Sequence, residues 1–183
     1  MEKIAKIKVM VNGMGNMAIN VVKHVLKDDR FELIPYALTG PVVTESKIMI
    51  DSQEIMLISS DLRVREETIV AILGIYKPFI SVDFTHPSAV NDNAEFYCRY
   101  GLPFVMGTTG GDRKHLEKTV ENSIICAVIA PNMAKQIVGL QAMMKYAANA
   151  FPNLFAGYSL VIRESHQASK ADTNGTAKRR IRF

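Results

Sequence analysis

Near its start the chain reads Ile7-Lys8-Val9-Met10-Val11-Asn12-Gly13-Met14-Gly15-Asn16-Met17-Ala18. The β-branched run at 7–11 predicts a strand, and the residues after the glycine turn predict an amphipathic helix to about Lys27. The turn matches the pattern G-x-G-x-x-G/A, in which the first glycine makes the turn, the second admits a pyrophosphate and the small third residue lets helix and strand pack closely. This order of elements predicts a dinucleotide site, and a plain tight connection between strand and helix is the alternative.

Strand and helix patterns alternate from residue 7 to residue 130. Further strands are expected at 32–38, 79–84, 103–106 and 124–130, with helices at 66–75, 88–100 and 112–122 and a hairpin at a sheet edge over 47–58. This alternation predicts an α/β fold, a Rossmann-like doubly wound parallel sheet with helices on both faces. A nucleotide domain of this size is complete at residue 130, so we expect a dinucleotide-binding domain over 1–130 and a second region over 131–183.

The second region is expected to begin with a long apolar helix over 134–150. Its methionines, Met143 and Met144, are expected to fill a core. A strand is expected to follow at 158–162.

The loops after two of the predicted strands carry polar residues and glycine. In an open α/β sheet the loops beyond the carboxyl ends of the strands line the ligand crevice, so we expect Phe84, Thr85 and His86 to face a cofactor. Gly107-Thr108-Thr109-Gly110-Gly111 holds the same position after the next strand and offers amides and hydroxyls to a nicotinamide and a small substrate. Structural turns without a ligand are the alternative for both loops.

The end of the second predicted strand is where such a domain selects its cofactor. An acidic residue there would hold the ribose hydroxyls of NADH, and a basic residue nearby would bind the extra phosphate of NADPH. Leu38-Thr39-Gly40 contains neither, and the next basic side chain is Lys47. Because the acid is absent, NADPH is slightly favoured, and use of either NADPH or NADH stays open.

The sequence Glu164-Ser165-His166-Gln167-Ala168-Ser169-Lys170-Ala171-Asp172-Thr173-Asn174-Gly175-Thr176-Ala177 gathers groups that bind an anion. Gly175 permits close approach of the backbone, its neighbours offer side-chain hydrogen bonds, and a helix starting here would favour negative charge at its N-terminus. We expect a carboxylate as the guest. His166 titrates near neutrality, and Lys170 can donate a proton when burial or nearby cations lower its pKa. A polar loop that caps a helix is the alternative.

The composition narrows the class of protein. Of the 183 residues 48% are apolar, and the formal net charge of +4 comes from 22 basic and 18 acidic residues. The basic residues in 178–182 account for this excess, so the body is neutral and no nucleic-acid partner is expected. Cys98 and Cys126 are far apart, which suggests neither a disulfide framework nor a thiolate metal site.

The chain also lacks the usual membrane and export signals. No apolar run approaches the ~20 residues that span a membrane, so no membrane partner is expected. The first strand begins within a few residues of Met1, which leaves no room for a leader. A cytoplasmic protein is therefore expected, with the plastid stroma after removal of a transit peptide as the alternative.

The motifs together resemble one enzyme family. They are Gly13-x-Gly15-x-Met17, Val82-Asp83-Phe84-Thr85, Gly107-Thr108-Thr109-Gly110, Ala130-Pro131-Asn132-Met133 and Glu164-Ser165-His166-x-x-x-Lys170-x-Asp172-x-x-Gly175-Thr176-Ala177. The set is similar to dihydrodipicolinate reductase (4-hydroxy-tetrahydrodipicolinate reductase) of the lysine and diaminopimelate pathway. The run at 87–95 resembles the plant-type branch of that family, and the resemblance extends over nearly the whole chain.

The resemblance implies a reductase that passes a hydride from NADPH or NADH to a cyclic imine dicarboxylate, giving tetrahydrodipicolinate. It implies catalytic roles for His166 and Lys170, with Lys170 as the leading proton donor, and it implies no metal. The implied contacts to the substrate are Gln167, Asn174, Gly175, Thr176 and Thr109. The implied contacts to the cofactor are Asn12, Gly13, Met14, Gly15, Asn16, Met17, Thr39, Phe84, Thr85, Gly107, Thr108, Thr109, Pro131, Asn132 and Met133.

The chain departs from the family pattern at several places. The glycine loop is one residue shorter and is closed by Ala18, Gln167 stands where many bacterial members have a second histidine, and Asn174 replaces the usual serine. The chain also stops at Phe183, where the family continues through most of a substrate-domain sheet.

Two interpretations stay open. One is a C-terminally shortened but active reductase, and the other is a cofactor-binding homologue that has lost turnover and has a regulatory role. We favour the enzyme, because the motif at 164–177 has little purpose without a substrate. Strand edges left exposed in a truncated substrate region predict a homodimer.

Overall fold

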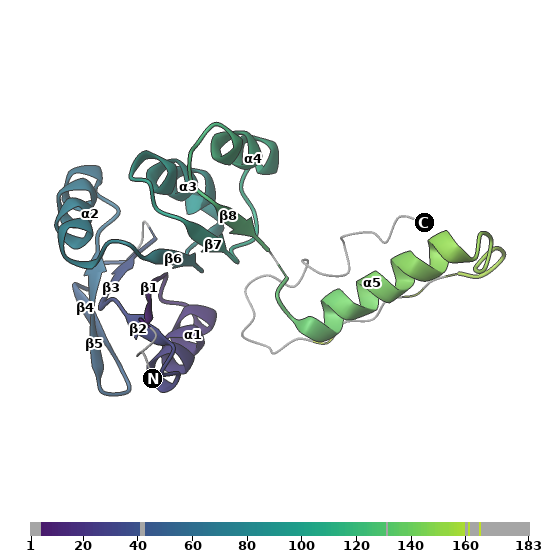
Figure 1. Cartoon of the computed structure of the whole chain (residues 1–183), viewed down its shortest axis with the longest axis horizontal. Helices are drawn as coiled ribbons and strands as arrows, with labels where there is room; N and C mark the ends of the chain where they lie inside the picture. The colour runs from purple at the N-terminus through teal and green to yellow at the C-terminus, as the bar shows by residue number, and fades with distance from the viewer. Residues whose placement is uncertain (1–4, 41–42, 131, 160, 162–164, 166–183) are drawn as a thin grey trace. The chain divides into compact units, whose positions relative to one another are not determined.

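The computed structural model describes residues 5–40, 43–130, 132–159, 161 and 165. The chain divides into two compact units, residues 1–131 and residues 132–183. The elements of the first unit are β1 (Ile7–Asn12), α1 (Asn16–Lys27), β2 (Phe31–Leu33), β3 (Tyr36–Leu38), β4 (Lys47–Ile50), β5 (Gln53–Ile58), α2 (Leu62–Tyr76), β6 (Ile80–Asp83), the short 3-10 helix η1 (Pro87–Ala89), α3 (Val90–Arg99), β7 (Phe104–Met106), α4 (Arg113–Glu121) and β8 (Ala127–Ile129) (Figure 1). The second unit contains α5 (Lys135–Ala150).

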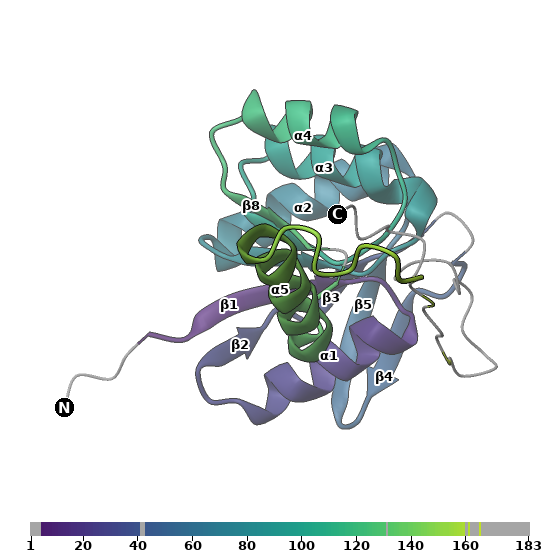
Figure 2. The ribbon, with the colours of Figure 1, turned by 90° about the vertical axis from the view of Figure 1, so that its right-hand side faces the viewer.

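Five parallel strands form the main sheet, in the order β2-β1-β6-β7-β8. The chain runs from β1 to β2 on one side and returns to β6 on the other side of β1, so the order of the strands reverses between β1 and β6. Helix α1 covers one face of the sheet, while α3 and α4 cover the other (Figure 2). The predicted Rossmann-like doubly wound sheet is therefore confirmed.

The single strand expected over 32–38 is wrong, because the structure has two strands in different sheets. Strand β2 belongs to the main sheet, whereas β3 joins a separate three-stranded sheet of order β3-β5-β4. Pro35 lies between them and has no amide N–H for a sheet ladder. A tight turn at this point joins Ile34 to Tyr36, whose amide donates to the Ile34 carbonyl at 2.8 Å.

The predicted hairpin is present as the antiparallel pair β4 and β5. Asp51 in its turn has φ 52°, the left-handed conformation that aspartate tolerates. The hairpin lies at a sheet edge as predicted, with β4 as the edge strand, and the sheet is the separate one that it forms with β3. Strand β3, which Pro35 separates from β2 of the main sheet, pairs in parallel with β5 and completes the second sheet.

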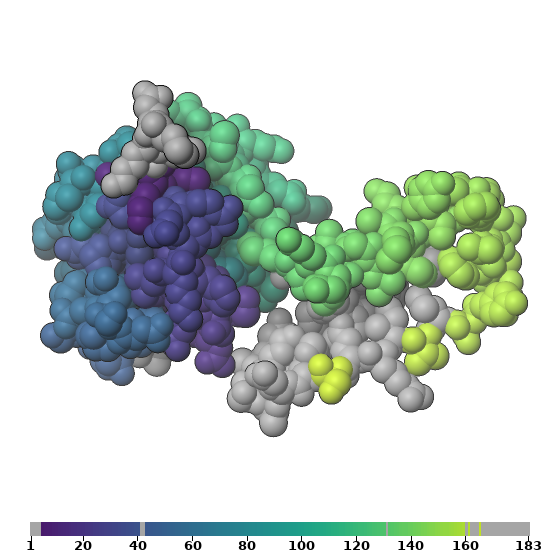
Figure 3. Space-filling model, turned by 60° about the horizontal axis from the view of Figure 1, so that its bottom comes forward, coloured from purple at the N-terminus to yellow at the C-terminus, as the bar shows by residue number. Residues whose placement is uncertain are grey.

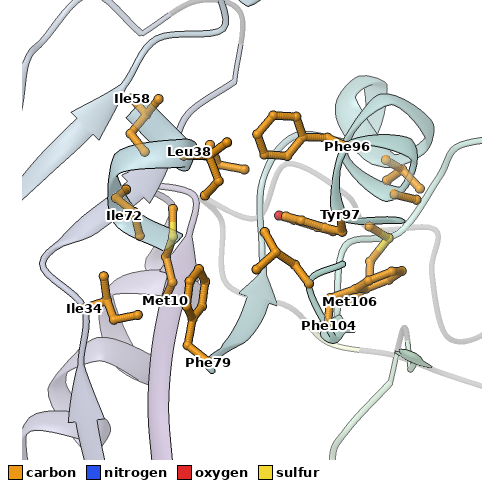
Figure 4. Packing of buried hydrophobic residues seen from close by; sticks show 14 of the residues in the cluster. Met10, Ile34, Leu38, Ile58, Ile72, Phe79, Phe96, Tyr97, Phe104 and Met106 are labelled. Carbon is orange, nitrogen blue, oxygen red and sulfur yellow. The ribbon is translucent and has the colours of Figure 1, made fainter. Parts of the chain in front are cut away.

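The buried side chains of β1 alternate between two hydrophobic clusters. Met10 packs in the cluster covered by α2, α3 and α4, whereas Val11 packs with Ala18 and Val22 of α1. Because the sheet is covered on both faces, its strands are mostly apolar, and β7 and β8 contain only apolar residues. Figure 4 shows the first cluster, which includes Met10, Ile34, Leu38, Ile58, Ile72, Phe79, Phe96, Tyr97, Phe104 and Met106.

Two element boundaries differ from the sequence prediction. Helix α2 begins at Leu62 rather than at 66, because the Asp61 carboxylate accepts from the Arg63 amide at 3.0 Å and from the Val64 amide at 3.2 Å. Strand β8 covers only 127–129 of the expected 124–130, since Ile124 lies fully exposed in the turn after α4.

In the second unit, α5 has the predicted position but no buried residue. Met143 is 64% exposed, so the expectation that it fills a core is wrong for the described part of the chain. Figure 3 shows the surface of α5 in green. Of the strand expected at 158–162, the described residues Tyr158, Ser159 and Val161 lie in no strand, and the others lie outside the described residues.

Candidate functional site

The carboxyl ends of β1, β6 and β7 lie side by side at one edge of the main sheet. Backbone hydrogen bonds join the loops that leave these strands. The Phe84 amide donates to the Asn12 carbonyl at 2.9 Å, and the Gly107 amide donates to the Asp83 carbonyl at 2.9 Å. Three loops that are far apart in the sequence are thus brought together at the point where the strand order reverses, which is where ligands of open α/β sheets bind.

The two glycines of the first loop have different surroundings. Gly13 has φ +102°, and a Cβ built there would lie 2.4 Å from the Phe84 carbonyl oxygen, so only glycine fits. Gly15 has φ −75°, and a Cβ built there would meet no described atom within 4 Å. Nothing in the described chain therefore requires glycine at position 15, whereas close approach of a ligand to this backbone would require it.

Helix α1 starts directly after Gly15 without a side-chain cap. The amides of its first turn are therefore available to an anion, and the helix dipole adds to their attraction. Ala18 in this turn is 1% exposed and packs with Val11 of β1. A small residue at this position keeps α1 close to the sheet, as the dinucleotide pattern requires.

A buried hydrogen-bond relay lies beneath these loops. The Asn12 side-chain amide donates to the Tyr97 hydroxyl at 2.9 Å, and that hydroxyl donates to Asp83 Oδ2 at 2.7 Å. All three residues are fully buried. Asn12 Oδ1 also accepts from the Leu38 amide at 2.8 Å, which ties the end of β3 to the same relay. Burial and the neighbouring Asp83 raise the pKa of Tyr97 well above its ordinary value, so the hydroxyl keeps its proton.

Asp83 carries the other half of this network. Its Oδ1 accepts from the Thr85 amide at 2.9 Å, from the Thr85 hydroxyl at 2.7 Å and from the Thr108 hydroxyl at 2.9 Å. Its Oδ2 accepts from the Asn93 side-chain amide at 2.8 Å in addition to Tyr97. One buried carboxyl group thus fixes the first residues of the loops that follow β6 and β7.

Arg65 of α2 joins this network through Asn93. Its guanidinium donates to Asn93 Oδ1 and lies 4.3 Å from the centre of the Phe96 ring. Burial lowers the pKa of Arg65, while the nearby Tyr97 and Asp83 act in the opposite direction. The guanidinium reaches Asp83 only through the neutral Asn93 side chain, and its Nε is buried without a hydrogen-bond partner.

A cavity of about 270 Å³ opens beside Arg65, between α2 and α3. Its wall includes Thr39, at the strand end where the sequence showed no basic residue, together with Arg99. Two acidic residues, Asp92 and Glu95, line the same cavity. The charges near Thr39 therefore come from helices distant in the sequence, which is why a search around residue 39 could not find them.

Two predicted site side chains are engaged in local structure. The Thr39 hydroxyl donates to the Ile58 carbonyl at 2.9 Å, which holds the end of β3 against β5. His86 caps η1, since its Nδ1 accepts from the Ser88 amide at 3.2 Å. Thr108, by contrast, shares Asp83 with Thr85, so the loops after β6 and β7 are set by one group.

Most of the other predicted residues fall into three groups. Met14, Asn16 and Met17 lie on or beside the start of α1, and Met17 is 60% exposed. In the second unit, Asn132 Oδ1 accepts from the Ala134 amide at 3.1 Å, and Met133 is 44% exposed. Outside the described residues lie Pro131, His166, Gln167, Lys170, Asn174, Gly175 and Thr176.

Sequence reasoning missed the side chains that hold the site together. Asn93 and Tyr97 lie four residues apart on α3, so both reach the same face of that helix. The sequence did contain a signal for this network. Two polar side chains four residues apart lie on an otherwise apolar face of the helix, and that helix follows a strand that ends in Asp83. No group of three or more potential metal ligands occurs among the described residues, and no described helix is long and apolar enough to cross a membrane.

Comparisons with known proteins find relatives whose names describe reductases of one kind. A solved structure titled dipicolinate-bound dihydrodipicolinate reductase, from Paenisporosarcina sp. TG-14, has the same fold, with a TM-score of 0.61, 22% identity, and coverage of 81% of this chain and 56% of that chain. The chain is 45% identical over 172 residues to 4-hydroxy-tetrahydrodipicolinate reductase 2, chloroplastic, of Arabidopsis thaliana, covering 94% of this chain and 49% of the relative.

A rice protein shows the same relationship. The probable 4-hydroxy-tetrahydrodipicolinate reductase 1, chloroplastic, of Oryza sativa subsp. japonica is 42% identical, with 93% of this chain and 49% of the relative covered. The chain spans about half the length of these curated relatives. Residues 7–133 match the family model described as dihydrodipicolinate reductase, N-terminus. Because this match covers most of the 183 residues, the chain belongs to the dihydrodipicolinate reductase family.

Proposed function

We propose that the chain is part of a reductase that transfers a hydride from NADPH or NADH to the cyclic imine dicarboxylate of the lysine and diaminopimelate pathway, giving tetrahydrodipicolinate. The observation that carries the proposal is the open space at Gly15 beside the uncapped start of α1, in a chain of this family. The proposed domains are a dinucleotide-binding domain over 1–130 and a substrate-binding and oligomerisation region over 131–183.

In this proposal the first turn of α1 holds the pyrophosphate of the cofactor, because its amides have no side-chain cap. The loops after β6 and β7 hold the nicotinamide end, since both leave the sheet next to the glycine turn. When bound, the nicotinamide supplies the hydride. The hydroxyls of Thr85 and Thr108 both donate to Asp83. Because these hydroxyls are fixed in this way, we assign the two threonines a role in orienting the ligand and not in the chemical step.

The adenosine end of the cofactor is proposed to lie at Thr39. The neighbouring cavity carries Arg65 and Arg99, but Asp92 and Glu95 offset their charge. A cavity without excess positive charge gives the extra phosphate of NADPH no large advantage. Use of both NADPH and NADH therefore remains the proposal.

The catalytic roles are proposed from matched sequence positions. Lys170 would donate the proton that the carbon next to the hydride acceptor requires, and His166 would stand beside the substrate. Asn174, Gly175 and Thr176 would bind a substrate carboxylate through amide and hydroxyl donors, with Gln167 and Thr109 as further contacts. These donors would be strongest in a site from which water is excluded.

We also propose a homodimer and, following the names of the plant relatives, a plastid location as the alternative to the cytoplasm. The apolar side chains exposed on α5, including Val138, Leu140 and Met143, support self-association. Size-exclusion chromatography with light scattering would contradict the dimer if it found only monomer at assay concentration.

Oxidation of the reduced cofactor, with the pathway substrate generated in situ, tests the proposed function. The wild-type chain should turn over, and Lys170→Ala should lower turnover by about a hundredfold or more, the scale expected for loss of a general acid. Lys118→Ala on the exposed side of α4 is the matched control and should retain full activity.

The outcomes separate the two interpretations of the sequence. Cofactor binding without turnover in the wild-type chain would favour a cofactor-binding homologue with a regulatory role. Equal turnover in the wild type and in Lys170→Ala would remove Lys170 from the chemistry while leaving the reductase in place. A chain that binds neither NADPH nor NADH would contradict both interpretations.

A further inference from the structure

One hydroxyl group connects the two halves of the candidate cofactor site. Tyr97 of α3 is fully buried, accepts from Asn12 at 2.9 Å and donates to Asp83 at 2.7 Å. Asn12 and Asp83 are register partners at the carboxyl ends of β1 and β6. The Tyr97 hydroxyl therefore bridges the two strands between which the strand order reverses.

The relay continues from each partner to a different side of the site. Asn12 accepts from the Leu38 amide at 2.8 Å, at the end of β3 where the adenosine is proposed to lie. Asp83 accepts from the Thr108 hydroxyl at 2.9 Å, in the loop proposed to hold the nicotinamide. Besides the backbone bonds between the strand ends, these two loops are thus joined by a continuous chain of buried side-chain hydrogen bonds that passes through one hydroxyl.

We propose that Tyr97 is a positioning residue that holds the adenosine loop and the nicotinamide loop at the separation that one dinucleotide requires. This inference rests on the proposed function. Tyr97 does not touch the cofactor, because it is buried beneath the loops, and it acts through Asn12 and Asp83. The two halves of a dinucleotide are covalently joined, so only the intact molecule senses the separation of its two subsites.

The ring and the hydroxyl of Tyr97 have separable roles. The ring packs against Phe104 at 5.1 Å and Phe96 at 6.3 Å between ring centres, and Tyr97→Phe retains both contacts. Removing the hydroxyl leaves the Asn12 side-chain amide without its acceptor and takes one donor from Asp83 Oδ2. Asp83 Oδ2 keeps its bond from Asn93, whereas the buried Asn12 amide is left without an acceptor, and this cost favours a shift of the end of β1.

The test compares the dissociation constants of the intact reduced dinucleotide, of ADP-ribose and of reduced nicotinamide mononucleotide, measured by titration calorimetry well below the unfolding temperature. For Tyr97→Phe we expect the dissociation constant of the dinucleotide to rise about tenfold, while each half changes by less than about twofold. A role confined to stability would lower the unfolding midpoint and leave all three constants unchanged in the folded protein.

Two control variants distinguish an effect of Tyr97 on the separation of the two loops from a general loss of stability in the core. Tyr36→Phe removes a hydroxyl from a tyrosine at the margin of the same core, where its ring meets Tyr76 at 6.5 Å. Ile72→Val removes one methylene from the buried α2 side of that core. Both should leave the three dissociation constants unchanged.

The possible failures are distinguishable. Unchanged binding of the dinucleotide by folded Tyr97→Phe would overturn this inference alone. A wild-type chain that binds no dinucleotide would overturn the proposed function and this inference with it. If Tyr97→Phe does not fold, Asn12→Ser, which removes the donor to the Tyr97 hydroxyl and the acceptor of the Leu38 amide, takes its place with the same expected result and the same contradicting one.

Discussion

Asn12 and Asp83 stand opposite each other at the carboxyl ends of the two central strands, and both are fully buried. Their backbones lie under the Gly13 turn and the loop that begins with Phe84, while their side chains meet at the Tyr97 hydroxyl. One pair of residues therefore connects the ligand edge of the sheet to the core beneath it. Changes in this pair or in its neighbours should affect stability and ligand binding in separable ways.

Gly13→Ala should destabilise the fold strongly. Its φ of +102° strains any L side chain, and the added Cβ would lie 2.4 Å from the Phe84 carbonyl oxygen. We expect a loss of about 2 to 4 kcal/mol in the free energy of unfolding, in the range of strained backbone and overpacked sites. Urea unfolding followed by circular dichroism measures it. A loss below about 0.5 kcal/mol would contradict the close contact with Phe84.

Gly15→Ala should leave stability unchanged or slightly higher. Its φ of −75° suits alanine, and no described atom lies within 4 Å of the added Cβ. The same urea experiment should give a free energy of unfolding within about 1 kcal/mol of the wild type, because removing a glycine restricts the unfolded chain. A large loss would mean that position 15 is packed and not open.

Asp83→Asn should cost about 2 to 4 kcal/mol of unfolding free energy. The carboxyl group accepts from Thr85, Thr108, Asn93 and Tyr97, and an amide would point an N–H group at one of these donors. Thermal unfolding would measure the loss. Asp92→Asn, an exposed neighbour on α3, serves as the control and should change stability by less than about 1 kcal/mol.

Stability should fall at alkaline pH because of Tyr97. Its pKa is raised in the fold by burial and by Asp83, so the stabilisation is fully present below the tyrosine value of the unfolded chain, ~10, and is lost as the pH rises towards the folded value. The difference in unfolding free energy between wild type and Tyr97→Phe should be constant below pH ~10. Above that, it should shift against the wild type by about 1.4 kcal/mol per pH unit. A constant difference up to pH ~11 would contradict the raised pKa.

The fold could be predicted from local patterns, whereas the support of the site could not. The run at 7–11 and the Gly13 turn are adjacent in sequence, and the structure has the predicted strand, turn and helix there. Pro35 was a readable signal that 32–38 is not one strand. The Asp83 network joins α2, α3 and the ends of β1, β6 and β7, so no local pattern shows it.

The charged side chains around Thr39 also could not be predicted from the residues next to it in the sequence. The sequence near residue 39 has neither the acid nor the base that selects a cofactor, and the four charged side chains of the adjoining cavity come from α2 and α3. The motif at 164–177, which carries the proposed chemistry, lies almost wholly outside the described residues, so the roles of His166 and Lys170 stay predictions.

The most direct measurement is the dissociation constant of reduced nicotinamide dinucleotide for the wild type and for Gly15→Ala, by titration calorimetry. If the pyrophosphate lies against the backbone at Gly15, the methyl group occupies its place, and Gly15→Ala should bind at least ~10-fold more weakly, about 1.4 kcal/mol, while keeping its stability. Equal affinity in the two proteins, both folded, would contradict a dinucleotide site at this turn.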